Sequence, residues 1–353
     1  MSSAGSIQIL AERPVGWLKE DSSEENIALS SRIRLARNIS DFKFPINSSD
    51  TEREYVKEVI SSAVNSSGII KERLNFKIFE LSSVNKRFLL ERNLVSKNFC
   101  AGDIGSELIL DGDESFGIMV NEEDHIRMQI FSAGFLLKDL WEKINEKDVA
   151  LSKEVPFAFD TELGYLTSCP TNVGTGMRAS VMLNLPGLSI LGHLPGVIQG
   201  AEKLGMTVRG LHGEGSEVIG YMYQISNQST LGESEEEIIG RLEKLIQQIV
   251  LFEKNARQIL LQTRKNFVLD FVGRAYGALR YSYLISEKEA LTFLSALRMG
   301  VDMKMFNSLN IGKVNKLFIS VQDSHLQKIY GRELTPTERD SWRAELLREK
   351  LSN

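Results

Sequence analysis

The chain has 353 residues, 42% hydrophobic and 25% charged, which is the balance of a soluble globular protein long enough for more than one hydrophobic core. The net charge of −5, with scattered Lys and Arg, argues against nucleic acid as a direct partner, and two cysteines exclude a disulfide framework. Neither a secretory signal nor an apolar run of about 18 residues is present, so we expect a cytoplasmic protein without a membrane partner.

The first part of the chain predicts a lead-in followed by a strand. Residues 1–26 end in an acidic, serine-rich patch and are interpreted as an N-terminal lead-in. In an extended segment over 27–37, Arg32 and Arg34 fall on one face, with Ile33 and Leu35 on the other. Two parallel guanidinium groups would clamp phosphate oxygens, although a solvated basic strand fits the same pattern.

The next part of the chain is predicted to contain both helices and strands. Apolar spacing predicts a helix over 51–64, and apolar runs predict strands over 76–81, 87–95, 107–110 and 116–120. Residues 121–125, Asn-Glu-Glu-Asp-His, then crowd acidic groups between two apolar strands, since Ile126, Met128 and Ile130 alternate with polar residues. Such a junction suggests a site, but a solvated turn fits it too. A helix over 134–144 and a strand over 157–159 follow.

The stretch 165–185 has the layout of a reactive loop. Cys169 and Pro170 end an apolar entry, Gly174 and Gly176 follow, and Arg178 opens an alternating run. The glycines would let backbone N–H groups converge in an anion-binding nest beside the thiol. The alternative is an ordinary hairpin loop with a buried cysteine.

The last part is predicted to be helical. A strand over 206–210 leads to Glu214, which lies between glycines, and a further strand is predicted over 218–225. Ser234, Ser286 and Thr335 each precede a glutamate by three residues, the pattern that begins a helix. We place a domain boundary near residue 256, between a domain over 27–256 and a helical C-terminal domain over 257–353.

These features together suit phosphoryl transfer. The arginines would neutralise phosphate charge, and the carboxylates and the thiol would hold an acceptor. The sequence has neither a GxxxxGK[ST] nor a GxGxxG motif, so neither common nucleotide fingerprint applies.

Four ordered motifs resemble the phosphagen (guanidino) kinase family: Ser-Ser-Arg-Ile-Arg at 30–34, Asn-Glu-Glu-Asp-His at 121–125, Cys-Pro-Thr-Asn at 169–172 with Arg178, and Arg209-Gly210 with Glu214. The resemblance covers 27–256 and is greatest to the bacterial branch that phosphorylates arginine side chains in proteins. It implies an α+β fold, with a mainly antiparallel sheet flanked by helices and an all-helical C-terminal domain.

The resemblance also implies roles. ATP and Mg²⁺ would be the cofactors, with no metal ligand from protein side chains. The implied ATP-binding residues are Ser30, Ser31, Arg32, Ile33, Arg34, Arg127, Arg178, Ala179, Ser180, Val181, Met182, Arg209, Gly210, Leu211, His212, Gly213 and Glu214. Asn93 stands where the family has a histidine near the nucleotide.

The implied catalytic residues are Glu123, Glu214 and Cys169, the last as a thiolate beside the acceptor guanidinium. Exposing a neutral arginine nitrogen at pH 7 costs about 8 kcal/mol, because the pKa lies above 12. A carboxylate that accepts the proton as transfer proceeds avoids this cost. We therefore expect Glu123 to be the base and Glu214 to orient the acceptor.

Two further features distinguish a protein substrate from a free metabolite. Only 29 residues precede Ser30, which is too short for the helical front domain of small-guanidine kinases and predicts an open acceptor site. Residues 339–344, Arg-Asp-Ser-Trp-Arg-Ala, resemble the phosphoarginine-binding motif of the protein-phosphorylating branch, which implies allosteric binding of the product by Arg339, Asp340 and Arg343. Without the resemblance this segment is typical of a solvated helix surface.

The same resemblance implies partners and a stress-response role in marking proteins for degradation. Expected partners are protein substrates with accessible arginines, a zinc-binding activator, a heat-shock repressor, a Clp protease and a second copy of the chain in a homodimer. Two alternatives stay open: a kinase of free arginine, and a pseudoenzyme that only binds phosphoarginine.

Overall fold

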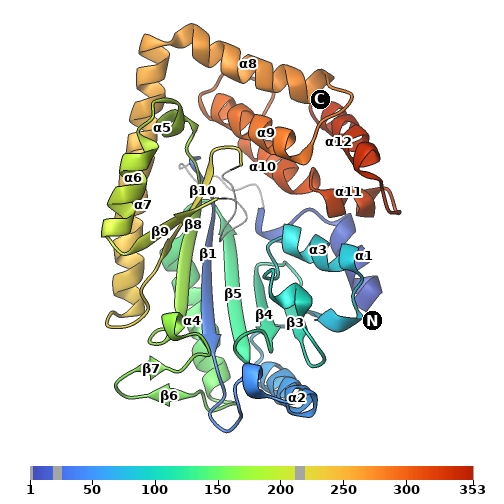
Figure 1. Cartoon of the computed structure of the whole chain (residues 1–353), viewed down its shortest axis with the longest axis vertical. Helices are drawn as coiled ribbons and strands as arrows, with labels where there is room; N and C mark the ends of the chain where they lie inside the picture. The colour runs from blue at the N-terminus through green and yellow to red at the C-terminus, as the bar shows by residue number, and fades with distance from the viewer. Residues whose placement is uncertain (1–2, 19–25, 211–218, 353) are drawn as a thin grey trace.

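The computed structural model describes residues 3–18, 26–210 and 219–352 (Figure 1). Glu214 and the neighbouring positions 211–213, predicted to bind ATP or acceptor, lie outside the described residues.

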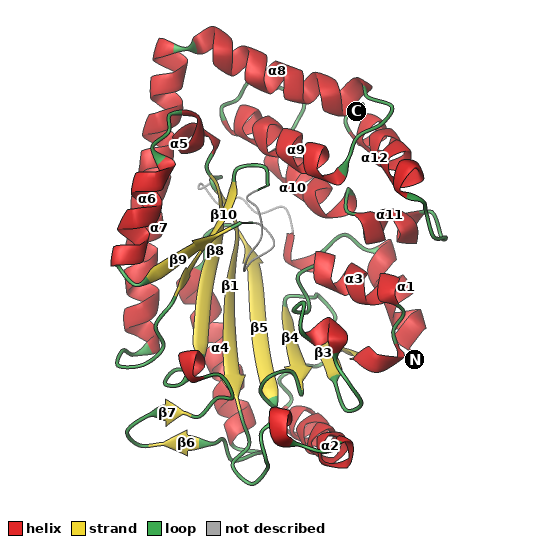
Figure 2. Ribbon diagram, in the orientation of Figure 1, coloured by secondary structure: helices red, strands yellow, loops and turns green. Residues whose placement is uncertain are grey.

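The centre of the molecule is an antiparallel eight-stranded sheet in the order β2-β3-β4-β5-β1-β8-β10-β9 (Figure 2). The long strand β1 (Ala28–Arg37) lies between β5 and β8. The other strands are β2 (Arg73–Lys77), β3 (Glu107–Asp111), β4 (Phe116–Val120), β5 (Ile126–Ala133), β8 (Met177–Asn184), β9 (Met206–Arg209) and β10 (Met222–Asn227). A separate hairpin pairs β6 (Phe159–Asp160) with β7 (Gly164–Tyr165). The fold is therefore α+β with a mainly antiparallel sheet, as expected.

One face of the sheet carries the main hydrophobic core. Ile33 and Leu35 of β1 are fully buried there, as their alternation with arginines predicted. The helices α2 (Asp50–Ser67), α4 (Leu137–Ser152) and α7 (Glu235–Thr263) pack on this face. The short helices α5 (Pro186–Ile190) and α6 (Leu194–Lys203) complete its edge. The opposite face carries Arg32 and Arg34 of β1 and the arginines of β5, β8 and β9, and parts of it are covered by two further hydrophobic clusters.

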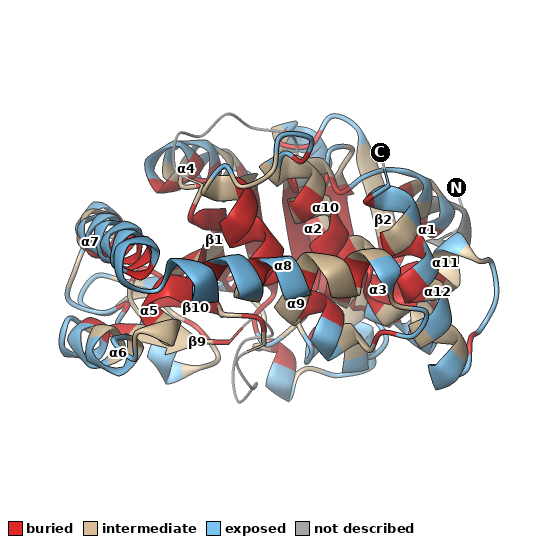
Figure 3. Cartoon of the chain, turned by 90° about the horizontal axis from the view of Figure 1, so that it is seen from above, coloured by how far each residue is buried: buried red, intermediate tan, exposed pale blue. Residues whose placement is uncertain are grey.

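The C-terminal region is helical, as predicted. It contains α8 (Lys265–Tyr281), α9 (Glu287–Asp302), α10 (Ile311–Ser320), α11 (Asp323–Ile329) and α12 (Pro336–Lys350). Ser234, Ser286 and Thr335 each form the predicted capping box at the start of α7, α9 and α12. The outward faces of α7 and α8 are exposed (Figure 3).

The predicted boundary at residue 256 lies inside α7, which continues without interruption to Thr263. The C-terminal helices also share a hydrophobic cluster with the sheet, in which Leu29, Phe131 and Met222 pack with Phe318 and its neighbours. The two regions are thus joined by a helix and a common core.

The N-terminal segment differs from the predicted lead-in. Residues Ser3–Glu12 form helix α1, and Ile7 and Leu10 are fully buried in a hydrophobic cluster with Phe76 of β2 and Leu108 of β3. Val15 and Leu18 join the cluster shared with the C-terminal helices. Their burial makes this segment part of the folded body.

The strand predicted over 87–95 is also wrong. Ser82 accepts a hydrogen bond from the Asn85 backbone N–H and begins helix α3 (Ser83–Glu91). A short apolar run does not distinguish a strand from a buried helix, and here the preceding cap decides. Similarly, the strand predicted over 76–81 ends at Lys77, and a single turn of 3₁₀ helix covers Ile78–Glu80.

Candidate active site

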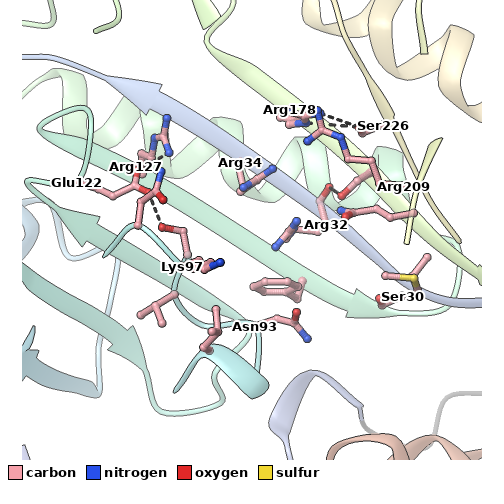
Figure 4. Close-up of a pocket in the computed structure, with 18 of the residues that line it drawn as sticks. Ser30, Arg32, Arg34, Asn93, Lys97, Glu122, Arg127, Arg178, Arg209 and Ser226 are labelled. Carbon is pink, nitrogen blue, oxygen red and sulfur yellow. Dashed lines mark hydrogen bonds and ion pairs between the residues drawn. The ribbon is translucent and has the colours of Figure 1, made fainter. Parts of the chain in front are cut away.

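Strand register brings the predicted phosphate-binding arginines to one face of the sheet. Arg32 and Arg34 of β1 lie opposite Ser180 and Arg178 of β8, and Arg127 of β5 lies opposite Ala36. Arg209 of β9 reaches the same face through its pairing with Gln224 of β10. In an antiparallel sheet, directly paired residues point to the same side. The five arginines therefore line one cavity of about 940 Å³ (Figure 4).

Crowding of like charges perturbs the two central arginines. Burial, and then the charge of Arg178, lower the pKa of Arg32 to about 10. Burial and then the charges of Arg32, Arg178 and Arg127 also lower the pKa of Arg34 well below its ordinary value. The Nε of Arg34 is buried without a hydrogen-bond partner in the described part of the chain. Such a cluster is complementary to a polyanion, which would satisfy the donor and relieve the repulsion.

The acidic loop after β4 lies at one end of this cavity. Arg127 forms ion pairs with Glu122 and with Glu123, whose Oε2 is 2.6 Å from Nη2. Burial lowers the pKa of Arg127, but Glu122, Asp124 and Glu123 outweigh it and raise that pKa. The Glu123 side chain is 43% exposed, whereas that of Glu122 is buried. Glu123 is thus the carboxylate of this loop that a guanidinium arriving from solvent can reach.

Asp124 connects the acidic loop to the cysteine loop. Its buried Oδ1 accepts hydrogen bonds from Asn38 Nδ2 at 2.8 Å and from the Ser168 backbone N–H at 2.7 Å. The Ser168 hydroxyl in turn donates to the Glu123 carbonyl oxygen. Asp124 therefore joins the end of β1, the carboxylate loop and the residue that precedes Cys169.

Cys169 also lines the cavity, half-buried, with Sγ 3.0 Å from the Thr171 hydroxyl. The predicted backbone nest beside it does not form. The N–H groups of residues 172–175 instead bond to Cys169, Pro170, Tyr165 and Thr230 carbonyl oxygens. Gly174, at a φ of +110°, is needed because a Cβ there would lie 2.1 Å from the Thr230 carbonyl oxygen. The glycines close the loop rather than bind an anion.

The residues predicted to bind ATP lie on both faces of the sheet. Ser30, Ser180 and Met182 line the cavity together with the arginines, as does Asn93. The side chains of four others are fully buried away from it: Ser31, Ile33, Ala179 and Val181. The side chains of these four residues point away from the arginine face, because the alternation that places Arg32 on that face turns its neighbours inward. Their predicted role in ATP binding stays a prediction. Gly210 directly follows β9 and does not line the cavity.

Some site residues escaped the sequence analysis. Ser226 accepts hydrogen bonds from Arg178 Nε and Nη2, at 3.4 and 3.2 Å. Ser96 donates to Glu122, and Asn38 and Ser168 hold Asp124. Asp124 stood in the acidic motif and could have been found there; the others are single polar residues without a local pattern.

The motif at 339–344 lies on α12, and its two arginines differ sharply. Arg343 is fully buried, and its guanidinium contacts Asp340 and Asp323 at 2.6 Å and the carbonyl oxygens of Val321 and Ile285. Arg339 is less buried and lies 3.1 Å from Asp323. Arg343 is therefore an internal counter-ion that makes four hydrogen bonds to the folded chain, and its predicted contact with phosphoarginine stays a prediction.

In the described ranges, no cluster of three or more His, Cys, Asp or Glu side chains could hold a metal ion. Among the same residues, every helix is too short or too polar to cross a bilayer.

Comparison with known proteins identifies the family. The model described as "ATP:guanido phosphotransferase, C-terminal catalytic domain" matches residues 55–256, and the one described as "Protein-arginine kinase McsB C-terminal domain" matches 265–353. The protein-arginine kinases of Halothermothrix orenii and Pelotomaculum thermopropionicum are 41% and 42% identical, over 95% and 96% of this chain and 96% of each relative. That of Bacillus cereus strain G9842 is 42% identical over 98% of both chains.

Solved structures with a similar fold include two kinases. The duplicated taurocyamine kinase of Schistosoma mansoni matches 67% of this chain and 34% of its own, with a TM-score of 0.60 and 28% identity. A lombricine kinase matches 70% of this chain and 71% of its own, with a TM-score of 0.60 and 23% identity, which bears on the fold alone. On its motifs, its fold and its nearly full-length relatives, the chain belongs to the protein-arginine kinases, a family of guanidino phosphotransferases within the phosphagen kinase fold.

Proposed function

We propose that this chain transfers the γ-phosphoryl group of ATP to the guanidinium of arginine side chains in proteins. One observation supports this most directly. The arginine face, where Arg34 Nε has no hydrogen-bond partner among the described residues, runs within a single cavity into the loops that carry Glu123 and Cys169. A polyphosphate and a guanidinium would then meet end to end, as phosphoryl transfer requires.

The arginines would act by binding and charge neutralisation. Arg32, Arg34 and Arg178 offer planar donor groups to the phosphate oxygens. The pKa values of Arg32 and Arg34 are lowered by burial and then by neighbouring arginine charges, and bound phosphates would offset both effects. Mg²⁺ would enter as part of the substrate Mg·ATP, since the described side chains provide no ligand cluster of their own. Bound in this way, it would offset part of the negative charge of the phosphates.

Glu123 is proposed as the base. Its Oε2 already binds a guanidinium, that of Arg127, at 2.6 Å, so the carboxylate has the geometry that an arginine substrate needs. Exchange of Arg127 for the substrate would release Arg127 toward the phosphate, while Glu122 and Asp124 remain beside it. The acceptor nitrogen then attacks the γ-phosphorus, the bond to the ADP oxygen breaks, and Glu123 takes the proton from that nitrogen.

Cys169 and Glu214 are proposed to hold the same guanidinium. A thiolate at Cys169 would add a negative neighbour rather than a covalent nucleophile, in keeping with its place in the cavity wall. For Glu214 the proposal rests on the motif resemblance alone. The exposure of Glu123 supports an acceptor carried by a protein, because a side chain on a large partner must enter from solvent.

Regulation by the product is a further part of the proposal. Phosphoarginine would bind at α12 through Arg339 and Asp340, whose side chain is 39% exposed, with Arg343 holding Asp340 in position from inside. We extend the proposal, on resemblance to the family, to a cytoplasmic homodimer with a zinc-binding activator. Its products would be marked for a Clp protease in the stress response, with a heat-shock repressor among the substrates. Two free cysteines, Cys100 and Cys169, fit a reducing compartment.

The test is direct. Purified protein is incubated with Mg·ATP and either casein or free arginine, and the products are analysed by mass spectrometry under conditions that preserve acid-labile phosphate. We expect phosphoarginine in casein, none with the Glu123→Ala variant, and little phosphorylation of the free amino acid. Phosphorylation of free arginine alone would indicate a small-guanidine kinase. Binding of phosphoarginine proteins without any transfer, even with activator present, would indicate a pseudoenzyme.

A further inference from the structure

The connection between α8 and α9 exposes three large side chains close together, where the end of α8 lies beside α12 (Figure 1). Tyr281, the last residue of α8, is 70% exposed, Tyr283 is 77% exposed and Leu284 is 62% exposed. Single exposed apolar side chains are common, but neighbouring ones mark surfaces that bind a partner. We call Tyr281, Tyr283 and Leu284 the tyrosine patch.

The backbone of this loop is fixed to α12 at both ends. Near its start, the Ser282 carbonyl oxygen accepts a hydrogen bond from Arg348 Nη1. At its end, the Ile285 N–H donates to the Asp340 carbonyl oxygen at 3.2 Å, and the Ile285 carbonyl oxygen accepts from Arg343 Nη1 at 2.8 Å. The loop therefore presents the tyrosine patch in a set geometry, so that little further chain would have to be ordered when a partner binds.

The tyrosine patch is continuous with the part of α12 proposed to bind phosphoarginine. Arg343 Nη1 donates both to the Ile285 carbonyl oxygen and to Asp340 Oδ1, at 2.8 and 2.6 Å, so the Asp340 carboxylate adjoins the end of the loop. Farther along α12, the Arg348 guanidinium lies 4.6 Å from the centre of the Tyr283 ring. Asp340 and Arg348 are eight residues apart in this helix, which is about 12 Å at about 1.5 Å per residue. Three or four residues of extended chain, at about 3.3 Å each, span the same distance.

Two arginines give the tyrosine patch a positive border. Arg348 lies over Tyr283, and the Arg280 guanidinium lies 5.6 Å from the centre of the Tyr281 ring. Arg280 donates to the Arg348 carbonyl oxygen and to the Ser352 hydroxyl, and Arg348 donates to a carbonyl oxygen of the loop. These acceptors are neutral and leave both positive charges in place. Tyrosine and arginine are also the residue types enriched at binding hot spots. The surface thus suits a polypeptide that combines an apolar residue with negative charge, which phosphorylation of arginine introduces into a protein.

We infer that the tyrosine patch is a docking surface for the polypeptide that carries phosphoarginine: an aromatic or other apolar side chain three or four residues from the phosphoarginine packs on Tyr283 and Leu284. This inference rests on the proposed phosphoarginine site at α12 and gives that site sequence selectivity. Free phosphoarginine has no flanking residue and would contact only Asp340 and its neighbours in α12. The site would therefore respond to phosphorylated proteins, according to the sequence around the modified arginine, more strongly than to the free amino acid.

Two synthetic peptides with one central phosphoarginine test the inference. One has phenylalanine three and four residues from the phosphoarginine on both sides, and the other has serine at those positions. Binding to the full chain is measured by fluorescence anisotropy without ATP, and binding of free phosphoarginine by calorimetry. We expect the wild type to bind the phenylalanine peptide about tenfold more tightly, the effect of one buried aromatic contact. In Tyr283→Ala combined with Leu284→Ser, the two peptides should bind equally, while the affinity for free phosphoarginine changes less than about twofold.

Phe267→Ala is the matched control. Phe267 also belongs to α8 and is 46% exposed, but it lies 14 residues before Tyr281, about 21 Å along the helix. This variant should keep the wild-type preference for the phenylalanine peptide. Because the replaced side chains are exposed, both variants should melt within about 2 °C of the wild type.

Three results would overturn the inference. The wild type could bind both peptides equally, the preference could survive in the double variant, or the double variant could have a lower mass in sedimentation velocity, since the tyrosine patch would then contact a second copy of the chain. Failure of the proposed function looks different. A wild type that binds neither peptide nor free phosphoarginine has no phosphoarginine site at α12, and a wild type that leaves casein unmodified lacks the proposed activity whatever its peptide preference.

Discussion

Replacing Asp124 tests whether this buried carboxylate holds the two catalytic loops together. In Asp124→Ala, the Asn38 amide and the Ser168 N–H both lose the Oδ1 that they contact at 2.8 and 2.7 Å. Hydrogen bonds to a charged group contribute about 1.5 to 3 kcal/mol each, and buried donors left unpaired add to the loss. We therefore expect the free energy of unfolding to fall by about 3 to 5 kcal/mol.

Activity should fall as well, because Ser168 contacts the Glu123 carbonyl oxygen and precedes Cys169. A displacement of about 1 Å in such a site can lower the rate about 100-fold. Asp124→Asn keeps an acceptor oxygen and loses only the charge near Arg127 Nε, 3.5 Å away, so it should lose about 1 to 2 kcal/mol and much less activity.

Urea denaturation monitored by circular dichroism gives the stability, and phosphoarginine formation in casein gives kcat. Asp103→Asn is the control, since its carboxylate is 71% exposed and its ion pair with Arg53 should contribute less than about 1 kcal/mol. If Asp124→Ala were as stable and as active as the control, Asp124 would not join the loops.

The other predictions concern single side chains. Glu123→Gln should lower kcat by about 100- to 10,000-fold in the casein assay and leave ATP affinity by calorimetry nearly unchanged, because the base acts in the transfer step; an equal loss in both would place Glu123 in nucleotide binding. Cys169→Ala should lower kcat about tenfold, the effect of one charged contact, without changing the melting temperature, and full activity would make the thiol dispensable. Burial, then the charges of Asp323 and Glu91, raise the pKa of Glu287 to about 7. Its contribution to stability is thus complete below its ordinary pKa of 4.5 and lost as the pH rises through about 7, so urea titrations of Glu287→Gln should lack that part of the pH dependence. Arg343→Ala should lose about 3 to 5 kcal/mol in the same titrations by leaving Asp323 buried with one partner fewer, and a loss below 1 kcal/mol would show that Arg343 is free to bind a ligand.

Local patterns predicted much of this site. The alternation around Arg32 and Arg34 correctly placed both on one face of a strand. The alternation that begins at Ile126 likewise predicted the strand that the structure shows there. Capping boxes located three C-terminal helices, because a cap involves only residues three apart. Motif order indicated the family, but it did not show that the side chains of Ile33 and Val181, two residues of the motifs, lie in the core.

What the sequence by itself determined is therefore what depends on neighbours a few residues apart: strand faces, helix starts and the acidic and cysteine motifs. Only the tertiary structure decided which of these meet. Pairing of β1 with β5 and β8 gathers arginines from distant parts of the chain into one cavity. Packing of α11 against α12 makes Arg343 a buried counter-ion and leaves Arg339 nearer the surface, although both lie on one helical face. Long-range pairing and burial depend on contacts that no local pattern contains.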